Sequence, residues 1–471
     1  MAKAVTPHSP TTAKILKALG IFGSVQVITV LCSVVRTKLV AIWIGPLGVG
    51  LITIYNSTIE LMSSVTQCNL HQSAVRDIAQ EVDKSRIVAV TRKLALLLGV
   101  GGLLLMLLAS PSLSYFSFGD TEHAIAFAIL SLTMLLSAVT SGESAVMQGL
   151  ERLKPLARRT MFASVTATAI AVPLFYFFRI SGIVPVLIVF AASNCFYSWL
   201  LRVRDVERVK VGFRQAWDDG KGMLALGFYM TVSMASSLLA SYVFVAWLNH
   251  TDGSVAVGVY QAGYTLVNSY VGMIFTAIAM EYYPRLASVV RSRWRTSVVM
   301  SHEIKIVLWV LIPVSLFFIA FKEPVIDFLY SDEFYGALPY VGFAIIGVCL
   351  RGASVCMAYV IVARGDGRLY VVTELTSAVV YLCLNIPLYT CYGYAGLGVA
   401  YVLWYLVYTG VCYAVCSVRY GLRLRRGIGT LLACALCAGG LAFALDAMWG
   451  GVAAAVLGCI GAVAAYRRIL R

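Results

Sequence analysis

Two oppositely charged residues stand inside long apolar stretches near the start of the chain. Arg36 lies nine residues before the turn Gly45-Pro46-Leu47-Gly48, and Glu60 follows that turn. A charge in such a segment is costly unless it meets water or a partner. The planar guanidinium of arginine matches phosphate oxygens, so Arg36 is a candidate ligand for a phosphate group. It is also a candidate partner of Glu60, and the sequence leaves both roles open.

Polar residues accompany these charges at helical spacing. Gln26 and Ser33 share a face of residues 14–44, and Asn56, Glu60 and Gln67 share a face of residues 47–77. Such stripes are expected to turn away from lipid. We predict that they line a polar, wet cavity; hydrogen bonding between neighbouring helices is the alternative.

A second, less charged set follows about 208 residues later. Gln261, Tyr264 and Asn268 stripe one predicted helix, and Arg351 lies inside another. We expect Arg351 to be a second deep cation; the alternative is a structural cation buried against a helix-end carbonyl. For the other three residues, which we expect to be cavity residues, the alternative is hydrogen bonding between helices. The acids Glu60, Glu143 and Glu374 are candidates for carrying a coupling ion or proton, and the sequence does not choose among them.

The elements that hold these residues are membrane helices. The 471 residues are 60% hydrophobic and 13% charged, against about 25% charged in soluble domains. Apolar runs and breakers predict fourteen helices at 14–44, 47–77, 87–115, 123–148, 155–178, 182–202, 219–248, 255–286, 302–321, 335–363, 368–391, 395–419, 428–446 and 450–466. With both termini in the cytoplasm and the first helix uncleaved, most of the 37 Lys and Arg fall in inner loops, as the positive-inside rule requires.

The chain also repeats itself. GPLGVG at 45–50 is answered by GSVAVG at 253–258, and Val172-Pro173-Leu174 is answered by Ile386-Pro387-Leu388. An even number of helices in each repeat predicts two lobes inserted in the same direction. The expected domains are a cytoplasmic segment at 1–13, an N-lobe at 14–202, a basic linker at 203–218, a C-lobe at 219–420 and a C-terminal helix pair at 421–471.

Several functions find no support in the residues. The net charge of +15 is explained by cytoplasmic loops, so we expect no nucleic-acid partner. The five histidines lack metal-ligand spacing and no GxxxxGK[ST] loop is present, so we expect no metal, no cofactor and no catalytic residue.

The turn and helix GPLGVGLITIYNSTIELMSSV, the later QGLERLKPLAR and the two-lobe repeat resemble the MOP superfamily, and within it Wzx-type polysaccharide flippases such as those for O-antigen and common-antigen units. The resemblance covers roughly residues 14–420 and implies a V-shaped all-α fold in the bacterial inner membrane. It implies transport of an undecaprenyl-diphosphate-linked oligosaccharide between leaflets by alternating access, among membrane lipids and beside the polymerase and chain-length regulator of polysaccharide assembly. With such a substrate, the resemblance implies that Arg36 and Arg351 bind the diphosphate and that the polar residues of both stripes contact sugar. The helix pair after residue 427 departs from many Wzx proteins.

Two other classes stay open. A multidrug-type, cation-coupled antiporter shares the superfamily but has no need of deep cations such as Arg36 and Arg351. A membrane glycosyltransferase or polysaccharide polymerase needs catalytic carboxylates in a sizeable outer loop. The short predicted outer loops disfavour such an enzyme.

Overall fold

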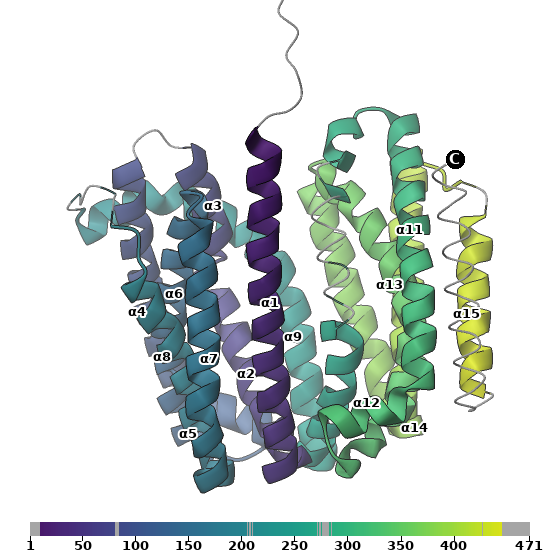
Figure 1. Cartoon of the computed structure of the whole chain (residues 1–471), viewed down its shortest axis with the longest axis horizontal. Helices are drawn as coiled ribbons and strands as arrows, with labels where there is room; N and C mark the ends of the chain where they lie inside the picture. Colours follow the sequence, from purple (N-terminus) through teal and green to yellow (C-terminus); the bar gives the residue numbers. More distant parts are fainter. Residues whose placement is uncertain are drawn as a thin grey trace, which may run out of the picture. The chain divides into compact units, whose positions relative to one another are not determined.

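Helices make up nearly all of the described chain (Figure 1). The computed structural model describes residues 10–80, 84–204, 206, 209, 211–270, 272, 275, 282–283, 285–425 and 427–444, and none of these residues lies in a strand. The predicted all-α fold is therefore confirmed. The last predicted helix, 450–466, lies outside the described residues.

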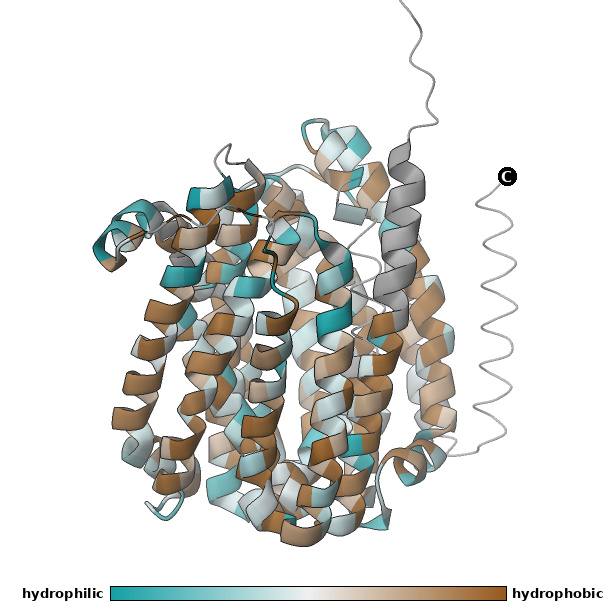
Figure 2. Ribbon diagram, turned by 60° about the vertical axis from the view of Figure 1, so that its left-hand side comes forward, coloured by the Kyte–Doolittle hydropathy of each residue, from teal (hydrophilic) through white to brown (hydrophobic). Residues whose placement is uncertain are grey.

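The helices have the length and composition of membrane spans. Seven spans among the described residues are long and apolar enough to cross a bilayer, and two of them, Lys154–Leu200 and Gly367–Arg419, contain 47 and 53 residues. A single crossing takes about 20 residues, so each of these two spans is long enough for two crossings. Hydrophobic residues run along the helices, with hydrophilic stretches near their ends (Figure 2). The chain is a multi-pass membrane protein.

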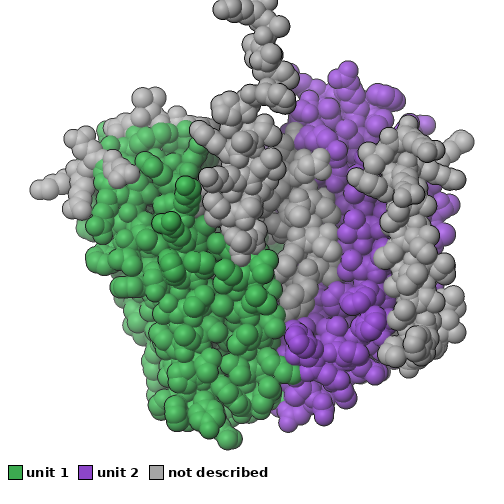
Figure 3. All heavy atoms as spheres, viewed as in Figure 1, with its two compact units in different colours: residues 1–238 green, residues 239–471 purple. Residues whose placement is uncertain are grey.

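The chain divides into two compact units, residues 1–238 and 239–471 (Figure 3). Unit 1 contains α1 (Pro10–Trp43), α2 (Pro46–Gln67), α3 (Leu70–Gln80), α4 (Lys84–Phe118), α5 (Ala124–Leu130), α6 (Leu132–Gly149), α7 (Leu153–Phe178), the 3-10 turn η1 (Arg179–Gly182), α8 (Ile183–Leu200) and the start of α9 (Phe213–Thr265). The boundary between the units falls after residue 238, inside α9. The expected lobe boundaries, at the two ends of the linker 203–218, remain a prediction.

The predicted helix 47–77 is broken in the structure. Cys68 and Asn69, between α2 and α3, both have left-handed backbones, with φ of 46° and 47°. Only glycine adopts this region without cost, although asparagine tolerates it. The break lets α3 take its own direction, and its residues Leu70, Ala74 and Ile78 enter the core of unit 1.

That core includes the segment that follows α8. Val211, Ala216 and Met223 are buried in the same cluster as Leu94 of α4 and Ile78 of α3. Polar contacts reinforce the packing of this segment on α4. The guanidinium of Arg86 binds Asp219 at 2.8 and 3.1 Å, and the ammonium of Lys93 lies 4.4 Å from the centre of the Phe213 ring. The segment 211–223 is thus a packed part of unit 1.

Unit 2 has a similar series of helices. It contains the rest of α9, kinked at Gly253, the π-helical segment η2 (Leu266–Tyr270), α11 (Arg293–Ala320), α12 (Lys322–Leu329), the 3-10 segment η3 (Asp332–Ala337), α13 (Leu338–Ala363), α14 (Gly367–Ala414), the π-helical segment η4 (Val415–Arg419) and α15 (Ile428–Ala444). α13 packs mainly on α14 and α11, and α15 packs on α11 and α13.

The internal repeat appears in the backbone of both units. Gly45 and Gly253, 208 residues apart, have φ of 76° and 80° and end one helix before the next. Gly182 lies against the carbonyl of Leu174, and Gly396 lies against the carbonyl of Leu388, at an offset of 214. A Cβ atom on either glycine would come within 2.7 or 1.9 Å of that carbonyl oxygen. Gly45 and Gly253 therefore serve the positive φ, and Gly182 and Gly396 serve the close approach of the backbone.

Candidate functional site

Arg36 in α1 has no acidic partner among the described residues. Its guanidinium carbon lies 4.9 Å from the centre of the Phe190 ring of α8, and the side chain is half-buried. Arg36 and Glu60 make no ion pair with each other. Glu60 is exposed on the surface of unit 1 and has no hydrogen bond to the described residues. In this structure both charges are available for other contacts.

The polar stripes of unit 1 divide into two groups. Gln67 is used inside the unit, where its amide donates to the hydroxyl of Ser137 on α6 across 2.9 Å. Gln26 is exposed and Ser33 and Asn56 are half-buried, and none of the three forms a side-chain hydrogen bond with the described residues. The second group can therefore bind water or a polar ligand.

Unit 2 holds its cation in a polar cluster. Nη1 of Arg351, on α13, donates to Oδ1 of Asn268 across 2.6 Å and lies 3.5 Å from the hydroxyl of Tyr401. The Tyr401 hydroxyl donates to the same Asn268 oxygen across 3.2 Å. The ring centres of Phe275 and Tyr405 lie 5.0 and 5.9 Å from the guanidinium carbon. Neutral oxygens and aromatic faces stabilise this charge, and no carboxylate of the described residues pairs with it.

Local backbone structure places Asn268 in this cluster. The residue lies in the π-helical segment η2, where the widened turn shifts the side chains that follow. Its amide nitrogen donates to the carbonyl oxygen of Tyr264 across 3.2 Å, which fixes the orientation of the amide. Gln261, about two turns before Asn268, donates to the hydroxyl of Thr265 across 3.3 Å. The structure thus brings Arg351, Asn268 and Tyr264 together.

Comparison with known proteins identifies the family. The model of a family described as polysaccharide biosynthesis proteins matches residues 15–290, more than half of the chain. The chain belongs to this family. Among its curated relatives, the lipid III flippases of Escherichia coli (strain K12) and Shigella flexneri are each 22% identical over 396 residues, which cover 80% of this chain and 92% of the relative.

Solved structures show the fold of this polysaccharide biosynthesis protein. The lipid II flippase MurJ in an inward closed conformation is similar with a TM-score of 0.74 at 13% identity, and the match covers 96% of this chain and 99% of that chain. An inward-facing multidrug resistance MATE transporter of the MOP superfamily is similar with a TM-score of 0.67 at 17% identity, over 86% and 95% of the two chains. The predicted MOP fold, with about fourteen helices, is confirmed.

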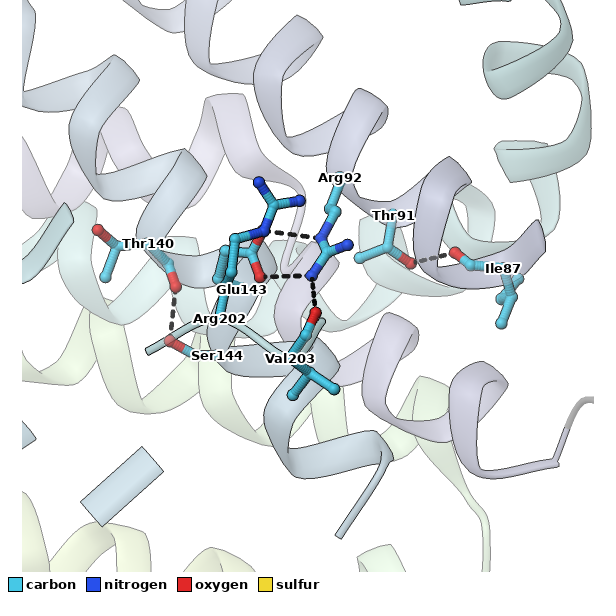
Figure 4. A network of polar contacts seen from close by, with 8 residues as sticks. All are labelled: Ile87, Thr91, Arg92, Thr140, Glu143, Ser144, Arg202 and Val203. Carbon is cyan, nitrogen blue, oxygen red and sulfur yellow. Dashed lines mark hydrogen bonds and ion pairs between the residues drawn. The ribbon is translucent and has the colours of Figure 1, made fainter. Parts of the chain in front are cut away.

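Within this polysaccharide biosynthesis protein, Glu143 of α6 lies in an ion-pair cluster (Figure 4). Its carboxylate accepts from Nε and Nη2 of Arg92, on α4, across 2.7 and 3.0 Å, and Nε of Arg202 lies 4.0 Å away. Nη2 of Arg92 also donates to the carbonyl of Val203 across 3.1 Å. The cluster fixes the chain after α8 to α4 and α6.

Glu374, the acid of α14, has a different kind of partner. Its carboxylate accepts from the hydroxyl of Tyr408 across 2.6 Å, and both residues lie on α14, which is kinked between them at Gly393. The printed partner of Glu374 is thus a phenol, whereas that of Glu143 is an arginine. Among the described residues no group of three or more His, Cys, Asp or Glu is arranged to hold a metal ion.

Sequence reasoning missed Tyr401, Tyr405 and Phe275. Tyr401 and Tyr405 stand four residues apart on α14, so one helix face carries both of them. That spacing was a visible signal, but tyrosines are so frequent in this part of the chain that it selects no particular pair. The π-helical turn at Asn268 has no signal in the residue pattern.

Proposed function

We propose that this protein is a flippase for an undecaprenyl-diphosphate-linked oligosaccharide in the bacterial inner membrane. It moves the substrate from the cytoplasmic to the periplasmic leaflet by alternating access between two lobes. The glycan is an O-antigen, common-antigen or capsule unit. Both termini lie in the cytoplasm, and the protein works as a transporter, beside the polymerase and chain-length regulator of the same assembly route.

The observation that carries this proposal is Arg351. A charge at the centre of a membrane helix costs at least about 2.5–3.5 kcal/mol on insertion scales. Arg351 is nevertheless present, oriented by Asn268 and Tyr401 and without a carboxylate partner among the described residues. Such a guanidinium is ready to bind an anionic group, and a diphosphate is the anionic group of this substrate class. Arg36, over Phe190, supplies a second cation.

Uncharged polar residues complete the proposed site. Gln26, Ser33 and Asn56 in unit 1 have no side-chain hydrogen bond to the described residues. In unit 2, Asn268 binds Arg351 and the carbonyl of Tyr264, and Gln261 donates to Thr265. Amides and phenols of this kind suit sugar hydroxyls. Gln67, which donates to Ser137, completes the polar lining of the proposed cavity. The candidates for carrying a coupling ion or proton are Glu60, Glu143 and Glu374.

Complementation tests the proposal. The gene is expressed in a strain that lacks its own flippase for a lipid-linked oligosaccharide, and surface glycan is measured together with protein level. We expect the wild-type chain to restore glycan, and Arg351→Ala and Arg36→Ala to abolish it at normal protein level. Arg295→Ala, which removes an exposed arginine from the start of α11, is the matched control and should stay active. Resistance to cationic drugs without any glycan would instead identify an antiporter.

A further inference from the structure

A third arginine is buried inside unit 1 and plays no part in the proposed site. Arg159 lies on α7, six residues after its start and therefore about 9 Å along the helix axis, and only 9% of it is exposed. Its Nη1 donates to the hydroxyl oxygens of Ser144 on α6 and Ser198 on α8, across 2.5 and 3.1 Å. No carboxylate among the described residues pairs with it. A charge with neutral partners only is unusual at this burial.

The two serines fix the orientation of the guanidinium. Ser144 donates its own proton to the carbonyl of Thr140 across 2.5 Å, and Ser198 donates to the carbonyl of Asn194 across 2.7 Å. Each hydroxyl oxygen is therefore left with lone pairs that accept from Arg159. Both contacts use Nη1. The two hydrogen bonds therefore hold one corner of the guanidinium and leave the opposite edge for another ligand.

That opposite edge is formed by Nε and Nη2. Nε is buried and has no hydrogen-bond partner, and Nη2 has only a 3.5 Å contact with the hydroxyl of Thr160. Two parallel N–H groups on one edge of a guanidinium match two oxygens of a phosphate or carboxylate. The unpaired atom thus belongs to the edge with which arginine binds oxyanions. The ring of His71, on α3, lies within electrostatic range of the same guanidinium and adds two further nitrogens to the surroundings.

The fold does not require a charge at this position. At the 214-residue offset that relates Pro173 to Pro387, Arg159 corresponds to Thr373 of α14 and Ser198 corresponds to Cys412. Thr373 is buried and donates to the carbonyl of Tyr370 in its own helix, and Cys412 is fully buried. Unit 2 therefore packs the equivalent helices with neutral side chains. The buried charge of unit 1 needs a reason other than packing.

We propose that Arg159, oriented by Ser144 and Ser198, is an anion-binding site that takes one phosphate group through its Nε–Nη2 edge. As an inner station for the diphosphate of the transported lipid, the site rests on the proposed function; as a phosphate site, it does not. Nε is closed to solvent in this structure, so the anion enters when α7 moves away from its neighbours.

Inorganic pyrophosphate is the first probe. The full-length protein is purified in detergent, and its thermal unfolding is followed with pyrophosphate and with chloride at equal ionic strength. We expect pyrophosphate to raise the Tm of the wild-type protein, and Arg159→Gln to weaken the apparent Kd by about tenfold or more, as for the loss of a charge-assisted bidentate contact. Arg158→Gln, which removes an exposed arginine from the adjacent position, should bind as the wild type does.

A second variant keeps the charge and removes its orientation. The double change Ser144→Ala and Ser198→Ala should weaken pyrophosphate binding while Arg159 remains, and it provides the test if Arg159→Gln does not fold. Pyrophosphate binding at wild-type strength in Arg159→Gln, or in the double serine variant if the glutamine variant cannot be purified, would overturn the proposal.

Two lipids then separate the possible sources of the phosphate. A polyprenyl diphosphate should compete with pyrophosphate in the wild type, and the corresponding polyprenyl monophosphate should compete more weakly if the site serves the transported lipid. Competition by free phosphate alone would keep the anion site and remove its link to transport. If the wild-type chain fails to restore glycan but pyrophosphate binding still depends on Arg159, the flippase proposal fails and the anion site stands.

Discussion

Arg351 and Asn268 are joined by a 2.6 Å hydrogen bond from a guanidinium to an amide oxygen. The bond orients the cation without cancelling its charge, because the acceptor is neutral. A carboxylate in the same place would orient the cation equally well and neutralise it. The choice of amide over acid at residue 268 is therefore informative about what the site binds.

Replacing Asn268 by aspartate tests this reasoning. Asn268→Asp should form an ion pair with Arg351, leave protein level normal and abolish glycan export, because the charge is no longer available to the substrate. Asn268→Ala is the control, since it removes the acceptor but keeps the positive charge, and it should retain part of the activity. Export at the wild-type level in the aspartate variant would show that the charge of Arg351 is not used.

Arg36 and Glu60 give a second prediction. Because the two residues form no ion pair in the structure, removing both should be no better than removing Arg36 alone. We expect Arg36→Ala and the double alanine variant to be equally inactive in the complementation assay. Arg36→Lys should be partly active, since a point charge does not reproduce the planar fork. Recovery of export in the double variant would mean that the pair forms in another conformation and that Arg36 has a structural role.

The cluster around Glu143 predicts a loss of stability. Glu143→Gln would leave the bidentate guanidinium of Arg92 without its carboxylate in a mostly buried position, at a cost of about 3 kcal/mol. Thermal unfolding of the purified protein measures this loss. Asp218→Asn breaks the exposed Asp218–Lys221 pair and should cost less than about 1 kcal/mol. Equal Tm values for the two variants would contradict the role assigned to the cluster.

Arg179 predicts a gain in stability. This exposed residue, just after α7, has φ of 46° and ψ of −120°, and its counterpart in unit 2 is Gly393, with φ of 58° and ψ of −139°. Non-glycine residues with such backbones carry about 1–3 kcal/mol of strain. Arg179→Gly should therefore raise the Tm, whereas Gly393→Ala should lower it. A lower Tm for Arg179→Gly would show that its side chain contributes more than the strain it causes.

The predicted topology has its own measurement. Reporter proteins fused after Arg471 and within 203–217 should both be active in the cytoplasm, and a reporter fused at 249–254 should be active in the periplasm. The reason is the distribution of Lys and Arg among the loops. A periplasmic reporter after Arg471 would contradict the count of fourteen helices.

Much of the fold was predictable because its signals are local. Helix ends coincide with Gly45 and Gly253, whose positive φ is a property of glycine itself, and the repeat of these turns revealed two similar halves. The break at Cys68 and Asn69 was not predicted. Cysteine is not a turn residue, and a single asparagine is a weaker signal of a break than glycine or proline.

The candidate site was predictable only in part. Arg36, Arg351 and Asn268 stood out because charges and amides are rare in apolar helices. Their partners did not stand out, since Phe190 and Tyr401 are ordinary residues of a membrane helix and their contacts depend on how helices far apart in sequence are packed. The same limit applies to Arg159, which in the sequence is one of several basic residues after α6 and in the structure is buried between Ser144 and Ser198.

The packing of residues 211–223 into the core of unit 1 has a consequence for the synthesis of the protein. Val211, Ala216 and Met223 complete a cluster whose other members lie on α3, α4 and α6. On the ribosome, those earlier helices are made and inserted first, and their shared core stays incomplete until the start of α9 has been translated. Folding of the first lobe is thus coupled to translation of the helix that leads into the second. A chain ending at Leu200 would contain every helix from α1 to α8 and would still expose apolar residues such as Leu94 and Ile78.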